Sequence, residues 1–124
     1  MRHLIIIIIT AFACTLQLQA QNSIDKLVNC FSQTGNCTYT SVVKRNPGNK
    51  KVEKVVKVLT MRYAKYDEMR NAFMTESKNG TLIENNNGET KNIILTIVSN
   101  KDVRIYKLSH DNNSFTTTIL IKPK

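Results

Sequence analysis

Few side chains in this sequence have the type and spacing that catalysis requires. His110 is the only histidine beyond position 3, and it stands next to Asp111 at the end of an expected strand. A serine or cysteine nucleophile needs a nearby base, and the sequence has no Gly-x-Ser-x-Gly motif that would place such a pair. Cys30 or Cys37 could act as a nucleophile with His110, but pairing of the two thiols with each other is favoured. We therefore expect no catalytic residue.

Carboxylates and glycines are not arranged for chemistry either. Asp67 and Glu68 are adjacent, so they do not share a face of a helix, and near a helix start both interact favourably with its dipole. The glycines at positions 35, 48, 80 and 88 are isolated, which excludes a glycine-rich phosphate loop, and no metal-binding spacing occurs. We expect neither a metal nor a cofactor, and a small enzyme is the least favoured function.

Two cysteines remain after position 20, and six residues separate them. In an oxidising compartment such a pair forms a disulfide more often than a metal site. Closing so short a loop would stabilise the fold by about 2.5 kcal/mol in the entropic view of disulfides. The spacing therefore predicts a Cys30–Cys37 disulfide, with two free buried thiols as the alternative.

The first twenty residues have the organisation of a secretory signal peptide. A basic start at residues 1–3 precedes an apolar run over 4–13 and a small residue at Ala20. The apolar run is about half of the ~20 residues that span a bilayer, so a transmembrane helix is the weaker interpretation. We expect cleavage between Ala20 and Gln21, and a periplasmic or secreted product. Lipidation of Cys14, within Ala-Phe-Ala-Cys, is a less favoured alternative.

Length and composition indicate one globular domain. The chain has 124 residues, of which 41% are hydrophobic and 22% charged, as in ordinary folded proteins. Removal of residues 1–20 leaves a single domain over 21–124 with 17 basic and nine acidic side chains, a net charge of +8. A domain of this size can bury enough surface to fold alone.

Hydrophobic periodicity predicts the elements that position these residues. Ile24, Leu27, Val28 and Phe31 share one face of a helix over 23–32, and a second helix runs from Tyr66 to about residue 78. Segments with the composition or alternation of strands lie at 37–45, 51–62, 81–84, 92–99, 103–110 and 115–122. The spacing in 51–62 also fits a helix, but four valines within residues 52–58 favour a strand. The order α-β-β-α-β-β-β-β predicts an α+β fold, an antiparallel sheet of about six strands with two helices on one face.

The hairpin over residues 44–62 holds seven basic side chains and one acidic one. A set around its turn could bind an anionic surface weakly; it consists of Lys44, Arg45, Lys50 and Lys51, with Lys57 added if that side chain faces outward. The alternative, which we favour, is that the lysines protect an outer edge from strand-to-strand aggregation. Export and the absence of tryptophan make nucleic acid an unexpected partner.

Three segments carry a family resemblance. They are Gln-Asn-Ser-Ile-Asp-Lys-Leu at 21–27, Tyr-Thr-Ser-Val at 39–42, and Lys-Arg-Asn-Pro-x-x-Lys-Lys-Val at 44–52. Together they resemble small exported proteins of unknown function from Bacteroides-type bacteria. The resemblance implies a periplasmic or surface α+β domain without catalytic residues. We expect a non-enzymatic interaction domain whose partner is a protein or envelope component, with a weak polyanion binder as the alternative.

Overall fold

The computed structural model of this protein describes residues 22–87 and 90–124. The expected signal peptide, its cleavage site between Ala20 and Gln21, and Cys14 lie outside the described residues, and these expectations stay predictions. In chain order the elements are α2 (Ser23–Ser32), β1 (Cys37–Arg45), β2 (Val52–Arg62), the 3-10 helix η1 (Tyr63–Lys65), α3 (Tyr66–Glu76), the 3-10 helix η2 (Ser77–Asn79), β3 (Thr81–Asn87), β4 (Thr90–Val98), β5 (Asp102–His110) and β6 (Ser114–Pro123).

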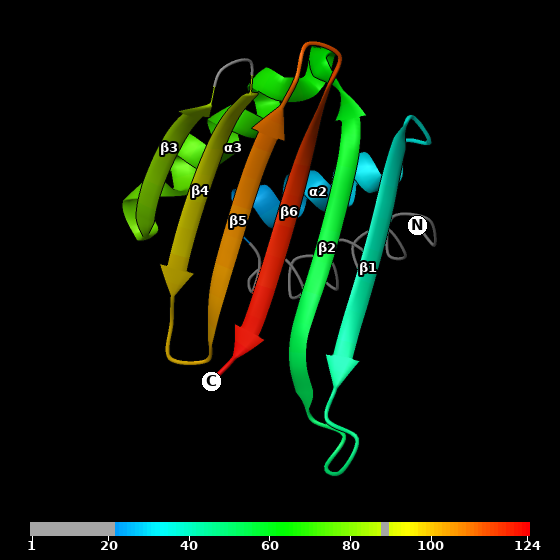
Figure 1. Ribbon diagram of the computed structural model, residues 1–124, viewed down its shortest axis with the longest axis vertical. Helices are drawn as coiled ribbons and strands as arrows, with labels where there is room; N and C mark the ends of the chain where they lie inside the picture. Colours follow the sequence, from blue (N-terminus) through cyan, green and yellow to red (C-terminus); the bar gives the residue numbers. More distant parts are fainter. Residues whose placement is uncertain (1–21, 88–89) are drawn as a thin grey trace, which may run out of the picture.

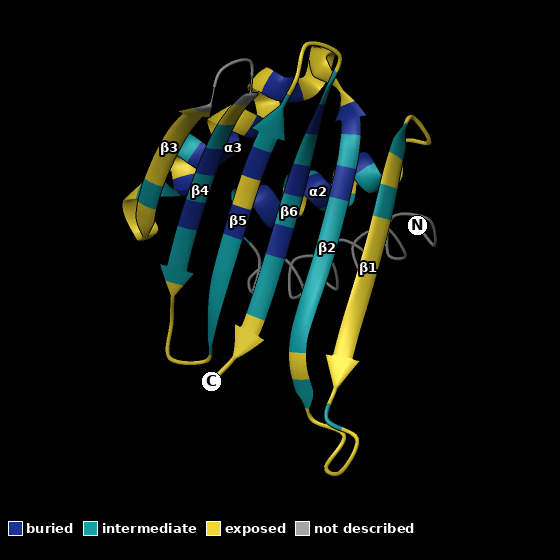
Figure 2. Cartoon of the chain, viewed as in Figure 1, coloured by how far each residue is buried: buried dark blue, intermediate teal, exposed yellow. Residues whose placement is uncertain are grey.

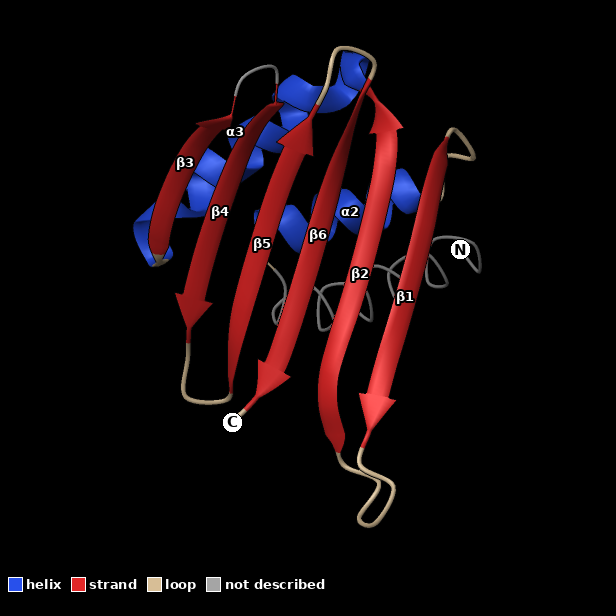
Figure 3. Cartoon of the chain, in the orientation of Figure 1, coloured by secondary structure: helices blue, strands red, loops and turns tan. Residues whose placement is uncertain are grey.

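The strands form one antiparallel sheet in the spatial order β1-β2-β6-β5-β4-β3. Figure 1 views the sheet from its uncovered side, with both helices behind it. In this view α3 lies behind β3 and β4, whereas α2 crosses behind the strands nearer β1; Figure 3 shows the same two layers by element type. The predicted α+β fold is therefore confirmed, with 27% helix and 54% strand.

Helix α2 begins at a capping box. The Asn22 side chain accepts a hydrogen bond from the Asp25 amide, and the Asp25 carboxylate accepts one from the Asn22 amide. These reciprocal bonds satisfy two of the amides that every helix start leaves unpaired. Beyond the cap, Ile24, Val28 and Phe31 are buried against the sheet, as their spacing predicts.

Helix α3 buries the face that its spacing predicts. Met69 and Phe73 are completely buried, and Tyr66 is nearly so. The regular helix ends at Glu76, and η2 carries the chain on to Gly80. A side chain on Gly80 would collide with the Thr96 carbonyl, so this position requires glycine for close approach of the backbones.

The hydrophobic core lies between the helices and one face of the sheet. Alternate residues of the four central strands point into it; the completely or nearly buried ones include Leu59, Leu95, Tyr106, Leu108, Phe115 and Ile119. The segment at 51–62 is strand β2, as its valine content predicted. β3 continues to Asn87, three residues beyond the predicted end, because Asn85, Asn86 and Asn87 all pair with β4.

The other face of the sheet is not covered by either described helix, and its residues form cross-strand rows. A lysine row consists of Lys44 and Lys54, which pair, and Lys122, which follows one residue beyond the Val55–Ile121 pair. The next row is apolar and consists of Val42, Val56, Leu120 and Ile105. A polar row farther along consists of Thr38, Thr60, Thr116, Ser109, Asn92 and Asn85. Figure 2 shows that the two edge strands, β1 and β3, and the ends of the hairpins are the most exposed parts of the sheet.

Candidate functional site

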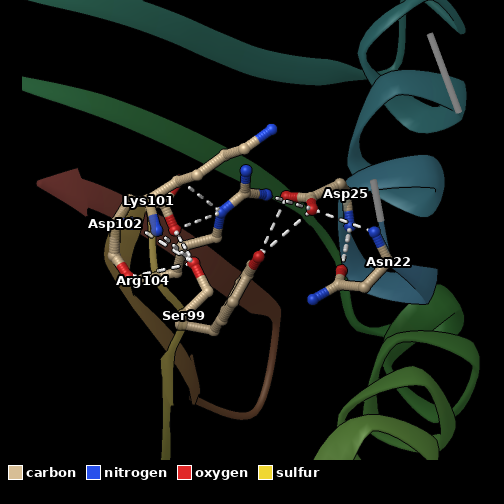
Figure 4. Close-up of polar contacts among 7 residues, drawn as sticks. Asn22, Asp25, Ser99, Lys101, Asp102 and Arg104 are labelled. Carbon is tan, nitrogen blue, oxygen red and sulfur yellow. Dashed lines mark hydrogen bonds and ion pairs between the residues drawn. The ribbon is translucent and has the colours of Figure 1, made fainter. Parts of the chain in front are cut away.

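The most connected polar group in the described chain is the Asp25 cluster, which consists of Asp25, Arg104, Tyr106 and Asp102. The carboxylate of Asp25 is 4% exposed, although it belongs to the first turn of α2. It accepts hydrogen bonds from the Tyr106 hydroxyl at 3.1 Å and from Arg104 Nη1 at 3.2 Å. Both partners come from β5, so Figure 4 shows one carboxylate joining the helix to the sheet.

Arg104 bridges this buried carboxylate to the β4–β5 turn. Its Nε donates to both carboxylate oxygens of Asp102, at 3.2 and 3.3 Å. The hydroxyl of Ser99 donates in turn to Asp102 Oδ1 at 3.2 Å, which ties down the start of the turn. Helix α2, strand β5 and the turn before it are thereby held in one geometry (Figure 4).

Burial and charge shift the pKa values inside the Asp25 cluster. Burial raises the pKa of Tyr106 far above its usual value of 10.0, and the neighbouring Asp25 carboxylate raises it further. Burial alone would lower the pKa of Arg104, but the hydrogen bonds to Asp102 and Tyr106 and the charge of Asp25 raise it. Tyr106 therefore stays a neutral hydrogen-bond donor and Arg104 a permanent cation. Such groups position the helix and have no proton to exchange near neutral pH.

A second buried carboxylate joins the two helices. Glu76, at the end of α3, accepts hydrogen bonds from the Ser23 amide at 3.0 Å and from Asn79 Nδ2 at 2.8 Å. Burial would raise the pKa of Glu76, but these two hydrogen bonds outweigh it, so the pKa lies below 4.5. The end of α3 thus satisfies an amide at the start of α2.

An open cleft lies where α3 begins beside the ends of β3, β4 and β5. Its volume is about 340 Å³, and polar side chains such as Arg70, Glu84 and Lys91 surround it. Tyr63 and Tyr66 stack with ring centroids 5.1 Å apart, and the His110 ring lies 4.4 Å from that of Tyr66. The imidazole is therefore a packing partner of two tyrosines.

His110 has one polar contact in addition to this packing, with the backbone carbonyl of Asp111, 3.3 Å from its Nδ1.

The predicted disulfide is not formed in this structure. Cys30 and Cys37 are both free, with Cys30 exposed and Cys37 half-buried. The Cys37 sulfur instead donates to the Phe31 carbonyl at 3.3 Å, and the Thr34 hydroxyl donates to the same oxygen at 2.8 Å. Both bonds satisfy a carbonyl at the end of α2. The Cys37 side chain thus contacts the helix backbone where the prediction placed a partner thiol.

The structure divides the predicted anion-binding set between different surfaces. Lys44 lies on the uncovered face opposite Lys54, because the strands alternate and Tyr39 and Cys37 point to the core. Lys57 pairs with Ile119, a core residue, and so lies on the other face. The structure thus places these two lysines, both members of the predicted set, on opposite sides of the hairpin.

The other members of that set lie around the hairpin turn. Arg45 donates to the Lys50 carbonyl at 3.3 Å, and Lys51 directly precedes β2. Lys50 adopts the left-handed conformation with φ 59°, the one such residue other than glycine in the described chain. Three of the five residues are therefore close together, and Lys44 and Lys57 point away from one another.

The uncovered face combines lysines with apolar side chains. Lys44, Lys54, Lys107 and Lys122 all belong to it by strand alternation. Lys44 is 3.6 Å from Glu53, at the irregularity in the β1–β2 pairing, whereas the other three lysines have no ion pair with any described residue. Exposed apolar side chains on this face include Val42, Ile83 and Val98, which are 56–61% exposed.

Sequence reasoning found the charged hairpin but missed the Asp25 cluster. One signal was present, since Asp25 occupies the third helical position after Asn22, where a carboxylate completes a capping box. A second was Arg104, which takes an inward position in an otherwise alternating apolar strand. Their contact spans 79 positions in the chain, which local spacing cannot reveal.

Within residues 22–87 and 90–124, no group of three or more His, Cys, Asp or Glu side chains could hold a metal ion. No helix in the same part is long and apolar enough to cross a membrane.

The fold and these surfaces define a small α+β domain with one sheet face packed on two helices and the other face open. The family that matches it is the domain of unknown function DUF5024, which covers residues 21–120, and the chain belongs to this family. Comparison with curated proteins and with solved structures gave no match.

Proposed function

We propose that this protein is an exported, non-enzymatic interaction domain of the cell envelope or surface, and that it binds an anionic partner through the uncovered face of its sheet. The observation that carries the proposal is the charge distribution on that face. Three lysines there have no ion pair with a described residue, and they surround an apolar row. A surface with this character suits a partner that offers clustered anionic groups.

The positions of the carboxylates support this assignment. Among the described residues, Glu53 is the one carboxylate that forms an ion pair with a lysine of the uncovered face. That lysine is Lys44, near the β1–β2 turn. Asp25 and Glu76 are buried beneath or between the helices, and Asp102 is bonded to Arg104 on the covered side. An approaching anion therefore meets little repulsion on the open side of the sheet.

The buried polar groups support a non-enzymatic role. The groups with the most shifted pKa values, Tyr106 and Arg104, hold α2 against β5. Shifted pKa values often mark active sites, but structural ion-pair networks produce them as well. Here the geometry of these two groups is explained by their contacts between α2 and β5.

The binding strength follows from the number of lysines. Each lysine near an anionic surface contributes about 1 kcal/mol, so the lysines of this face give weak binding that salt abolishes. Screening acts over about 10 Å at 0.1 M salt. Retention of the protein on anionic vesicles should therefore be strong at low salt and lost near physiological ionic strength.

Two charge-matched variants test which surface binds. Lys107→Glu/Lys122→Glu reverses two lysines of the uncovered face, and Lys50→Glu/Lys51→Glu reverses two at the hairpin turn. All four side chains are exposed, so both variants should melt close to the wild-type temperature. We expect the face variant to lose its retention on vesicles in which about one lipid in three is anionic. The turn variant should keep most of the wild-type retention.

The outcomes separate the alternatives. Loss of binding in the turn variant alone would assign the function to the set around Lys50 and Lys51 and overturn the proposal. No retention of the wild type at low salt, on vesicles or on heparin, would also overturn it. Retention on heparin without retention on vesicles would identify the anion as a polysaccharide and not a lipid headgroup.

A further inference from the structure

Strand β1 is an edge of the sheet with few of the features that normally protect an edge. It is nine residues long and pairs with β2 on one side only. Seven of its nine residues are exposed, and Figure 2 shows this as a nearly continuous exposed strand. Its charges are confined to its last two residues, Lys44 and Arg45, and Lys44 is 3.6 Å from Glu53. Edges of this kind offer unpaired backbone groups to another strand.

The central part of β1 is also apolar on both faces. Val42 is 61% exposed on the uncovered face, and Val43 is 46% exposed on the opposite face. Neither described helix lies behind the second half of β1, toward the β1–β2 turn, in Figure 1. The lysines that sequence analysis assigned to edge protection therefore do not protect the middle of the edge.

We propose that the protein forms a two-fold symmetric dimer in which β1 pairs antiparallel with β1 of a second copy, centred on Ser41. Ser41 is the middle residue of the nine, so this register pairs the whole strand with itself. A two-fold dimer requires a self-complementary surface, and an antiparallel strand pair related by a two-fold axis satisfies this requirement.

The charges agree with this register. Lys44 would lie opposite Thr38 of the other copy and Arg45 opposite Cys37, because positions that sum to 82 face each other. No cation is then opposite another cation, although each strand carries two. Like charges directly opposite on paired strands are destabilising, so a self-pairing edge must keep its charges away from its centre.

The two ends of β1 are complementary on the helix side. Near its start, Tyr39 packs against the core, whereas Val43 farther along is exposed. The two-fold register places the exposed Val43 of one copy beside Tyr39 of the other. The half of β1 without a helix behind it would thus meet the half that packs against α2.

The opposite edge of the sheet lacks this self-complementarity. Strand β3 has seven residues, and its middle residue is Glu84. A two-fold pairing centred there would set Glu84 directly against its own copy, and an exposed contact with Arg70 at 3.9 Å would only partly offset the repulsion. The dimer is therefore expected at β1 and not at β3.

Pairing at β1 would join two sheets into one, with both uncovered faces on the same side. The lysines of that face would then belong to one continuous surface. This inference does not depend on the proposed function, because the strand edge, and not the uncovered face, forms the contact. The two can fail separately, since one is measured by mass in solution and the other by vesicle retention.

Introducing a charge at the two-fold position tests the dimer. Sedimentation velocity of the wild type from residue 21 onward should show dimers at submillimolar concentration. Ser41→Lys sets two lysines against one another, and we expect it to raise the dissociation constant about fivefold or more. Ser41→Glu sets two glutamates against one another, but each also lies opposite Lys57 of its own copy, so we expect a smaller increase. Mixing the two variants sets the introduced lysine of one copy against the introduced glutamate of the other. The dissociation constant should then return to within about twofold of the wild-type value.

Thr40 provides the matched control, because it is also exposed and adjacent but faces Val42 of the other copy. Mixing Thr40→Lys with Thr40→Glu should therefore restore dimers less than the Ser41 mixture does, because the introduced charges are only diagonal neighbours. A monomeric wild type would overturn the inference, as would dimers that Ser41→Lys leaves unchanged. Rescue in the Thr40 mixture and not in the Ser41 mixture would also overturn it, since it would show another register.

Discussion

Replacing Asp25 by alanine tests whether one buried carboxylate holds α2 on the sheet. The change removes the acceptor for three donors, namely the Asn22 amide, Arg104 and the Tyr106 hydroxyl. Loss of the cap costs about 1 kcal/mol. An unpaired buried hydroxyl costs about 1–3 kcal/mol, and Tyr106 is completely buried.

The loss at Arg104 is smaller than for a fully buried ion pair. Breaking a fully buried pair costs about 3–5 kcal/mol, but the Arg104 side chain is 23% exposed and keeps Asp102 at 3.2 Å. We therefore take about 1 kcal/mol for this part, in the range of one hydrogen bond. The expected loss in the free energy of unfolding is about 3–5 kcal/mol, a large fraction of the stability of a small domain.

Urea unfolding followed by circular dichroism measures this loss directly, provided that the slope of the transition is unchanged. Asp67→Ala is the control, because this carboxylate is exposed at the start of α3 and should cost no more than about 0.5 kcal/mol. A double-mutant cycle with Arg104→Met should give a coupling of about 1 kcal/mol between Asp25 and Arg104. A loss below about 1 kcal/mol for Asp25→Ala, or strictly additive effects in the cycle, would refute the reasoning.

Four further predictions concern single groups. The pKa of Glu76 is lowered, so the stability that it confers is present above pH 4.5 and is lost as the pH falls below it; Glu76→Gln should flatten the acid limb of a stability–pH curve. The pKa of Tyr106 is raised, so unfolding should become easier above pH 10.0, by up to about 1.4 kcal/mol per pH unit, and Tyr106→Phe should reduce this slope in alkaline urea titrations. Thr117→Val should raise the unfolding free energy by about 1 kcal/mol, because the Thr117 hydroxyl is buried without a partner among the described residues. Mass spectrometry of the exported protein should show a chain that starts at Gln21, and a lipidated Cys14 or an intact Met1 would contradict the predicted cleavage.

The elements of this fold could be predicted because each has a local apolar pattern. Ile24, Val28 and Phe31 recur at helical spacing, and all three are buried under the sheet. β4 shows the alternation of apolar residues that predicts a strand, and in the structure Ile93 and Leu95 are buried while their neighbours are half-exposed. Short turns that join neighbouring strands indicated an antiparallel sheet, whereas the spatial order, with β6 between β2 and β5, came from the structure.

The polar contacts could not be predicted because they join distant parts of the chain. Asp25 and Arg104 are 79 positions apart, and the Ser23 amide and Glu76 are 53 apart. Each pair exists only after the sheet has placed the helices, so residue spacing carries no information about it. The prediction added Lys57 to the hairpin set only if it faced outward, and the pairing of β2 with β6 places it on the covered face, opposite Ile119.

The two faces of the sheet differ in how their charges are balanced. On the covered side Asp25, Glu76 and Asp102 accept hydrogen bonds from nearby helix, strand and turn groups, so most of this negative charge is used to fix the helices. On the open side Lys107 and Lys122 have no described carboxylate within ion-pair distance. Part of the uncompensated positive charge therefore points away from the helices, although Lys57 lies on the covered side. Under the proposed function, the protein would approach an anionic surface with the open sheet face first, and the lysines of that face, more than those along the hairpin, would select the partner.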